Sequence, residues 1–210
     1  MFKKRRIISL KIKNESEYIN EDFSRQSFAE QEIIGVEFTK CNFDYTDLNE
    51  ISTNACLFKE CGFTQTSFNG SSHNKSAFLN CRFIGSNLFK ASFENCKMTG
   101  STFETVNLLG INILEGDWSY VNLRNSDLKG INFNKARLTE IDLSGSNLDK
   151  ADLRDADLTR AILSKTSLSG ANLRGAKVEG IDFKNVSIRG AKIDIFQAIL
   201  IAESYGGKVE

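Results

Sequence analysis

The sequence predicts an elongated repeat fold in which short lengths of chain stack on one another. A large apolar residue occurs at every fifth position: of the 35 such positions from residue 23 to residue 193, only Thr53 and His73 depart from the set Phe, Leu, Ile, Met, Val and Trp. Two residues before these positions runs a second column, and from residue 36 to residue 191 it holds only Ala, Ser, Thr, Cys, Val, Ile or Gly. A helix repeats every 3.6 residues and a strand every two, so neither element alone explains a period of five.

Each group of five residues therefore buries one large and one small side chain and turns three residues towards solvent. The other three positions are rich in Asp, Asn, Ser, Lys, Arg and Gly. Proline is absent from the chain, which suits a backbone whose N–H groups are needed in hydrogen-bonded ladders.

The clearest quintets are "ADLRD" from Ala151, "ADLTR" from Ala156 and "ANLRG" from Ala171. They resemble the A(D/N)LXX motif of the pentapeptide-repeat family. The resemblance implies an all-β fold, a right-handed quadrilateral parallel β-helix with one quintet on each side and about twenty residues in each coil. About nine coils are then expected, and at about 4.8 Å per coil they make a rod roughly 42 Å long.

A period of twenty residues is also visible in the sequence. It places Phe43, Phe63 and Phe83 in one stack, which we expect in the core together with Leu153. It also places three of the five cysteines, Cys41, Cys61 and Cys81, in one stack of the small-residue column. Their spacing would allow a disulfide or metal ladder. No CxxC spacing or histidine partner supports such a ladder, so we interpret the thiols as reduced, small core residues.

We divide the chain into a basic N-terminal segment (1–20), the β-helix (21–193) and a C-terminal helix (194–210). Residues 1–13 hold six basic and no acidic residues. Their apolar part is too short and too charged for a signal peptide, and no run approaches the roughly 18 apolar residues of a membrane span. The sequence therefore predicts a cytoplasmic protein without membrane contact.

The C-terminal helix is expected to begin at Asp194, with Gln197 completing a capping box, and to end at the two glycines 206–207. Phe196, Ile199 and Leu200 share one helical face. This face should cover the exposed end of the β-helix and join two rods about a two-fold axis into a homodimer. A cap without a dimer is the alternative.

Catalysis is not expected. His73 is the sole histidine, so a Ser-His-Asp or Cys-His arrangement would have to include it. No phosphate-binding glycine loop or paired carboxylates are present. We therefore predict no catalytic, metal or cofactor site. Thr53 and His73 lie on one face in adjacent coils, and two interpretations remain: a local bulge with polar side chains outside the core, or a surface modified for a partner.

Other candidate partner-binding residues lie in outward columns. Phe89 and Leu109 are one coil apart on the same face, where residues 7–13 or a partner could cover them. Exposed acids form the second group. They are Glu32, Glu37, Asp44, Asp47 and Glu50 near the start, then Asp117, Asp127, Asp142, Asp152 and Asp157.

A finer resemblance concerns function. "EDFSRQSF" (21–28), "CNFDY", "CGFTQ" and "GDWSYVNL" (116–123) resemble the Qnr quinolone-resistance proteins. The resemblance implies a cytoplasmic homodimer that mimics duplex DNA, binds DNA gyrase and topoisomerase IV and protects them from fluoroquinolones, without binding nucleic acid itself. The unbroken register leaves no room for the projecting loops of several Qnr proteins.

Two alternative functions are an interaction scaffold with an unrelated protein partner and self-immunity against a gyrase toxin. Residues 14–210 hold 21 basic and 27 acidic residues, a net charge of −6. This is far below the charge density of DNA, so shape supports mimicry better than charge does.

Overall fold

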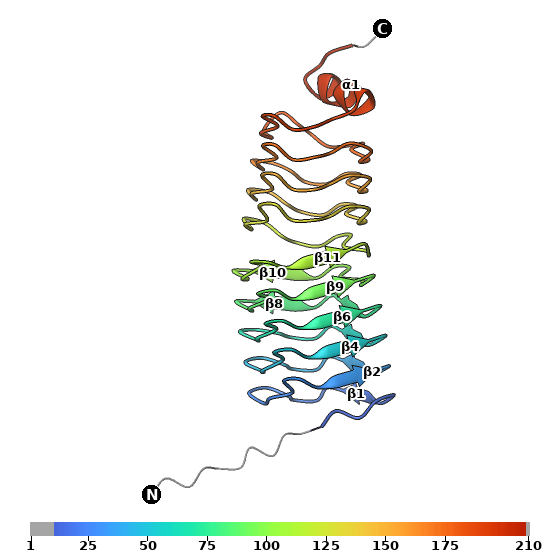
Figure 1. The fold of residues 1–210 in the computed structure, drawn as a ribbon, viewed down its shortest axis with the longest axis vertical. Helices are drawn as coiled ribbons and strands as arrows, with labels where there is room; N and C mark the ends of the chain where they lie inside the picture. The colour runs from blue at the N-terminus through green and yellow to red at the C-terminus, as the bar shows by residue number, and fades with distance from the viewer. Residues whose placement is uncertain (1–10, 209–210) are drawn as a thin grey trace, which may run out of the picture.

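A computed structural model describes residues 11–208, so most of the segment 7–13 and half of the basic segment 1–20 lie outside the described residues. The chain winds into the right-handed, four-sided parallel β-helix that the family resemblance implies, closed at one end by a helix (Figure 1). The elements are β1 (Glu17–Ile19), β2 (Glu32–Ile34), β3 (Glu37–Thr39), β4 (Ser52–Asn54), β5 (Leu57–Lys59), β6 (Ser72–Asn74), β7 (Ala77–Leu79), β8 (Arg82–Ile84), β9 (Ser92–Glu94), β10 (Thr102–Glu104), β11 (Asn112–Leu114) and α1 (Ile195–Ser204).

The described strands pair in parallel, each with a strand twenty residues away. Three sheets result, with strand orders β1-β3-β5-β7, β10-β8 and β11-β9-β6-β4-β2. These strands cover about five coils, and single bridges continue the same step as far as Asn172 and Lys192. The ladder begins before residue 21, since Glu17 pairs with Glu37 and Ile12 is buried in the core.

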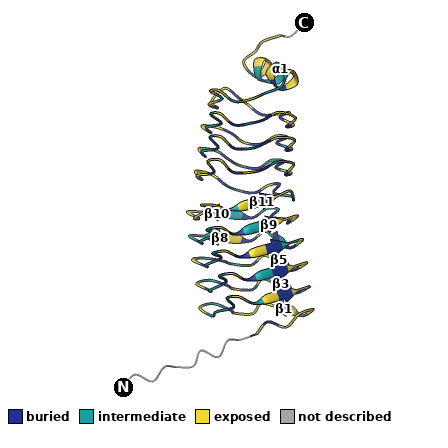
Figure 2. Ribbon diagram, viewed as in Figure 1, coloured by how far each residue is buried: buried dark blue, intermediate teal, exposed yellow. Residues whose placement is uncertain are grey.

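Large side chains fill the axis, as the five-residue period predicts. Phe43, Phe63 and Phe83 are each at most 1% exposed, and their rings stack with centroids 5.2 Å and 4.9 Å apart. Leu153 is fully buried. Figure 2 shows buried residues alternating with exposed ones along each coil. Because every coil buries its core mainly against its neighbours, stability is shared along the rod.

The small-residue column occupies the corners and ties successive coils together. A hydroxyl or thiol at a corner donates a hydrogen bond to the backbone carbonyl 23 residues earlier. Thr46 donates to the Phe23 carbonyl at 2.9 Å, and Ser146 donates to the Leu123 carbonyl at 2.7 Å. Ser, Thr and Cys at corners therefore satisfy buried carbonyl lone pairs as well as filling space.

The C-terminal helix α1 has the capping box that the sequence predicts. The Gln197 backbone N–H donates to Asp194 Oδ1 and the Asp194 N–H donates to Gln197 Oε1, both at 3.1 Å. The buried Gln197 amide also donates to the carbonyls of Leu173 and Ala176 in the last coils. Tyr205 follows the helix, and its hydroxyl donates to the Phe183 carbonyl. Polar contacts near its first turn and just after its last residue thus hold α1 across the end of the β-helix.

Candidate partner-binding surface

Thr53 and His73 lie in the core, so the predictions of an outward bulge or a partner-binding surface at these residues are wrong. Each is 1% exposed, and they are paired across β4 and β6 in the regular register. The physical reason is that polar neighbours satisfy them inside the rod. His73 Nδ1 lies 2.9 Å from Thr53 Oγ1, and His73 Nε2 lies 3.0 Å from Ser71 Oγ. Ser76 Oγ lies 2.9 Å from Thr53 Oγ1 and completes the network.

The His73 ring also takes the place of a phenylalanine in an aromatic column. It stacks on Phe93 with centroids 4.7 Å apart and meets Phe78 edge to face at 5.2 Å. Burial lowers the pKa of His73 to about 3, because the apolar core disfavours the charged imidazolium. The neutral ring is therefore a structural residue.

All five cysteines are buried and free, at the corners where the sequence predicts them. Their thiols donate to backbone carbonyls, for example Cys61 Sγ to the Phe38 carbonyl at 3.5 Å. The pKa of Cys61 is raised to about 12 despite a hydrogen bond from Cys41 that lowers it, since the hydrogen bond to Cys81 and burial outweigh it. Burial raises the pKa of Cys96 to about 11. Cys61 and Cys96 are therefore thiols at neutral pH, and thiolate chemistry at these two residues is disfavoured.

Four of the five aspartates predicted in the second half of the rod are engaged in ion pairs. Arg154 Nη2 lies 2.6 Å from Asp152 Oδ2. The hydrogen bond from Arg154 is the main cause that holds the pKa of Asp152 below its usual value. The remaining pairs are Arg124–Asp142 at 3.5 Å, Arg137–Asp117 at 3.9 Å and Lys177–Asp157 at 3.6 Å.

Two of these pairs belong to one column in which charge alternates from coil to coil. Its members are Lys97, Asp117, Arg137, Asp157 and Lys177. Asp127 alone of the five aspartates has no cation within ion-pair distance among the described residues, and it accepts hydrogen bonds from Asn147 and Lys129 N–H groups instead. The second half of the rod thus presents a largely compensated surface.

Uncompensated negative charge gathers in the first coils instead. Residues 11–60 hold eleven acidic and five basic residues, a net charge of −6, while residues 61–210 hold 16 acidic and 18 basic residues, a net charge of +2. Residues 1–10, outside the described residues, hold four basic residues and no acid. Within 11–60 the described ion pair is Lys40–Glu60 at 3.8 Å. Glu32, Glu37 and Glu50 are exposed, and Asp44 and Asp47 are half-buried. We call the eleven acids of this stretch the acidic end. They are Glu15, Glu17, Glu21, Asp22, Glu30, Glu32, Glu37, Asp44, Asp47, Glu50 and Glu60.

The acidic end also carries exposed apolar residues that sequence analysis did not single out. Ile19 and Tyr45 are each 52% exposed, and Ile34 is 38% exposed. All three lie outside the two core columns of the repeat, and this position in the sequence could have predicted their exposure. Of the predicted outward pair, Leu109 is 68% exposed, whereas Phe89 is half-buried with the Lys90 ammonium 5.2 Å from its ring.

The predicted dimer face is only partly available. Phe196 is exposed, but Ile199 and Leu200 are half-buried, and Leu200 packs against the core. Ile195 was not part of the predicted dimer face. It is the most exposed large apolar side chain of the described residues, at 82%. The free apolar surface of α1 is therefore centred on Ile195 and Phe196.

Within residues 11–208 no group of three or more His, Cys, Asp or Glu side chains is placed to hold a metal ion. In the same range, α1 is the one helix and is too short to cross a membrane.

The fold, the axial column and the corner column define a class of protein, a solenoid built of five-residue repeats. Models of pentapeptide repeats match residues 119–155, 136–175 and 166–194, in eight copies, and a pentapeptide repeat region matches residues 56–133. The chain belongs to the pentapeptide-repeat family. No protein with a curated description matches it significantly in sequence.

Solved structures of similar fold include two trypsin-treated variants of QnrB1, a plasmid-mediated fluoroquinolone resistance protein. They are 22% and 21% identical to this chain, each with a TM-score of 0.67, and the alignments cover 94% of this chain and 99% and 98% of theirs. HetL, a pentapeptide-repeat protein involved in heterocyst differentiation regulation in Nostoc sp. strain PCC 7120, is 22% identical over 85% of both chains, with a TM-score of 0.49. At these identities the likeness concerns the fold alone.

Proposed function

We propose that the protein binds a type II topoisomerase, DNA gyrase or topoisomerase IV, in place of duplex DNA and protects it from fluoroquinolones. Family membership and the fold shared with QnrB1 support the class of function. The observation that carries the proposal is the charge of the acidic end.

The charge density of the acidic end is close to that of DNA. Residues 11–60 make two and a half coils of twenty residues, or about 12 Å of rod at about 4.8 Å per coil. A net charge of −6 over that length is about 0.5 charge per Å. Duplex DNA carries one charge per about 1.7 Å, or about 0.6 per Å. A basic groove that binds DNA would therefore attract this end of the rod in particular.

The mimicry is thereby assigned to the first coils, whereas the ion-paired aspartates between residues 117 and 157 contribute little to it. A carboxylate that is already paired with Arg or Lys presents no net charge for a basic partner to neutralise, and desolvating the pair costs free energy. Under this proposal the protein acts in the cytoplasm, as a homodimer joined through α1.

The test is gyrase supercoiling in the presence of a fluoroquinolone, with three proteins at micromolar concentration. The wild type should restore supercoiling. The variant Glu32→Gln, Glu37→Gln, Glu50→Gln should need roughly tenfold more protein, because it removes half of the net charge of the acidic end. The matched control Asp142→Asn, Asp152→Asn, Asp157→Asn also neutralises three acids and should stay within about twofold of the wild type.

No rescue by the wild type, together with no binding to gyrase, would refute the function. If the triple Glu variant restores supercoiling as well as the wild type does, the proposed function stands, but mimicry by the acidic end is refuted. If the wild type neither rescues nor binds gyrase, an interaction scaffold with an unrelated partner remains as the second candidate, favoured by the exposed Ile19, Ile34 and Tyr45.

A further inference from the structure

The hydrogen-bonded ladder of the rod is interrupted on two of its four sides between residues 101–120 and residues 121–140. On the other two sides it continues, since the Phe103 N–H donates to the Asn122 carbonyl at 3.0 Å and the Trp118 N–H donates to the Arg137 carbonyl at 2.8 Å. At the far end of the Phe103 side, next to the opening, the Thr105 N–H has no acceptor among the described residues. On the open sides, six amide groups have no acceptor among the described residues. They are the N–H groups of Leu108, Gly110, Ile113, Glu115, Asp127 and Asn132. We call this opening, residues 105–115 facing residues 124–135, the seam.

In the next coil, the equivalent repeat positions form the regular backbone hydrogen bonds. The N–H groups of Leu128, Gly130, Phe133 and Lys135 donate to carbonyls one coil further on at 2.8 to 2.9 Å. Bridges between residues 107 and 127 and between 112 and 132 are absent, while those from 127 to 147 and from 132 to 152 are present. This is the one step between described coils at which two adjacent sides are open, and Figure 1 shows it as a wider step above β11. A smaller gap lies on a single side between residues 161–165 and 181–185, where the N–H groups of Leu163 and Asp182 have no acceptor among the described residues.

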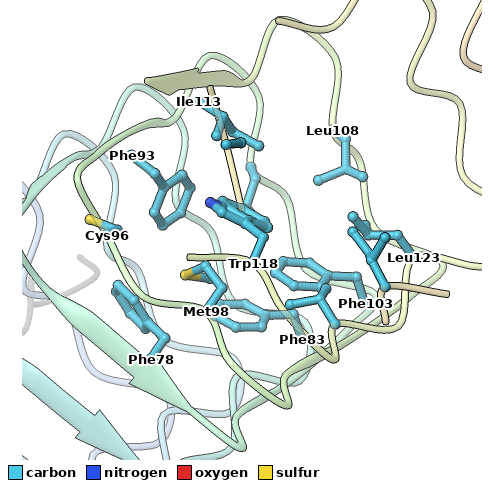
Figure 3. Packing of buried hydrophobic residues seen from close by; sticks show 14 of the residues in the cluster. Phe78, Phe83, Phe93, Cys96, Met98, Phe103, Leu108, Ile113, Trp118 and Leu123 are labelled. Carbon is cyan, nitrogen blue, oxygen red and sulfur yellow. The ribbon is translucent and has the colours of Figure 1, made fainter. Parts of the chain in front are cut away.

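Three cavities open along the seam. Their volumes are about 260, 300 and 440 Å³, and each is lined by residues from both coils. The first lies between residues 108–111 and 127–131. Next to the seam, Trp118 is buried among Phe93, Phe103 and Ile113 (Figure 3), and its indole N–H has no acceptor among the described residues. The seam thus combines open space between two coils with a buried N–H donor that has no acceptor among the described residues.

One pair of corner residues is found at the seam and at no other step of the rod. Ile111 and Ile131 occupy the same corner in consecutive coils, and no other corner has isoleucine in two consecutive coils. Neither can donate the hydrogen bond that ties one coil to another, and two β-branched side chains replace two small ones. At the adjacent corner, the Ser126 hydroxyl donates to the Arg124 carbonyl of its own coil instead of reaching the coil before it.

The arrangement of open and closed sides defines an axis. The two continuous sides meet at the corner of Tyr120, and the two open sides meet at the corner of Gly110, diagonally opposite. A body joined along two adjacent edges and open along the other two can rotate about the joined corner. We propose that the seam is a hinge about the Tyr120 corner, held open by Ile111 and Ile131, which lets the acidic end and the helix-capped end of the rod change their relative angle.

Amide hydrogen exchange tests whether the seam is open in solution. The six seam amides should exchange at least about tenfold faster than the amides of Leu128, Gly130, Phe133 and Lys135, which occupy the same repeat positions one coil further on and act as internal controls. Equal protection of the two sets would overturn the proposal.

Spin-label distances test the rotation itself. Glu50→Cys with Lys150→Cys spans five coils along the open corner, and Glu60→Cys with Arg160→Cys spans five coils along the joined corner. All four residues are exposed, and in a regular rod both backbone separations would be about 24 Å. The first pair should give the longer and broader distribution. Wild-type protein, whose five cysteines are buried, is the labelling blank. Identical distributions for the two pairs would overturn the hinge.

A third measurement tests whether the isoleucine pair keeps the seam open. Ile131→Ser places a hydroxyl where it can donate to the Leu108 carbonyl, as Ser146 does to Leu123, and should slow exchange at Leu108 and Asp127 at least threefold. Ile51→Ser, at the same corner where the ladder is closed, is the control and should leave the seam amides unchanged. Faster or unaltered exchange in the Ile131 variant would refute the role of the isoleucine pair.

Discussion

The imidazole of His73 and the hydroxyl of Thr53 lie 2.9 Å apart at the centre of an otherwise apolar axis, one coil apart and shielded from solvent. Both side chains are satisfied by the corner serines Ser71 and Ser76, so the pair forms a closed polar network inside an aromatic column. Such a network is stable while the imidazole is neutral, and protonation would place an unpaired charge in the core.

Stability should therefore fall in acid because of His73. Its pKa is about 3 in the folded protein, below the ordinary 6.5, so the unfolded chain binds the proton more readily. The contribution is complete above pH 6.5 and is lost as the pH falls from 6.5 towards 3, by roughly 1.4 kcal/mol per pH unit. Urea unfolding at pH 7.5, 6.0 and 5.0 measures the slope. His73→Phe, which keeps the ring stacked on Phe93, should flatten it; an unchanged slope would locate the titration elsewhere.

Replacing an axial leucine should unfold its neighbourhood. Leu153 is fully buried, so Leu153→Ala should lower the free energy of unfolding by about 2–5 kcal/mol. Leu153→Asp should abolish cooperative unfolding of the neighbouring coils, because the carboxylate has no partner on the axis. Circular dichroism melts measure both. Ser164→Ala, in an exposed position two quintets away, is the control, and a Leu153→Asp protein that melts like it would contradict the axial assignment.

Corner hydroxyls should contribute measurably to stability. Thr66 Oγ1 donates to the Phe43 carbonyl at 2.6 Å, and both groups are buried. Thr66→Val keeps the shape and removes the donor, so the free energy of unfolding should fall by about 1–2 kcal/mol. Thr64→Val, in the same quintet but half-exposed, should change it by less than about 0.5 kcal/mol. Similar effects of the two substitutions in denaturant titrations would argue against the corner tie.

Self-association should depend on the exposed apolar residues of α1. Ile195 and Phe196 are 82% and 54% exposed, so Phe196→Asp should convert a dimer into a monomer without lowering the melting temperature. Leu200→Asp should lower the melting temperature as well, since Leu200 packs against the core. Light scattering combined with thermal melts separates the two effects. A wild-type monomer, or a Phe196→Asp dimer, would exclude the tip-to-tip interface.

The period of five residues was sufficient to predict which side chains line the axis and which occupy the corners. In a solenoid each quintet repeats the same local geometry, so the position of one residue within its quintet fixes the positions of all the others. Leu153 and Phe63 could therefore be placed on the axis without knowing their neighbours. The two polar exceptions follow the same rule. We misplaced Thr53 and His73 because polarity argued for the surface, whereas serines at the adjoining corners satisfy them inside.

The sequence by itself thus determined the winding of the chain and the division between core, corner and surface, because these depend on spacing within one quintet. Only the tertiary structure decided what depends on residues twenty apart: which aspartates meet a cation, as Asp157 meets Lys177, and which remain free at the acidic end. It also decided where the ladder opens, because Ile111 and Ile131 become neighbours only when successive coils stack.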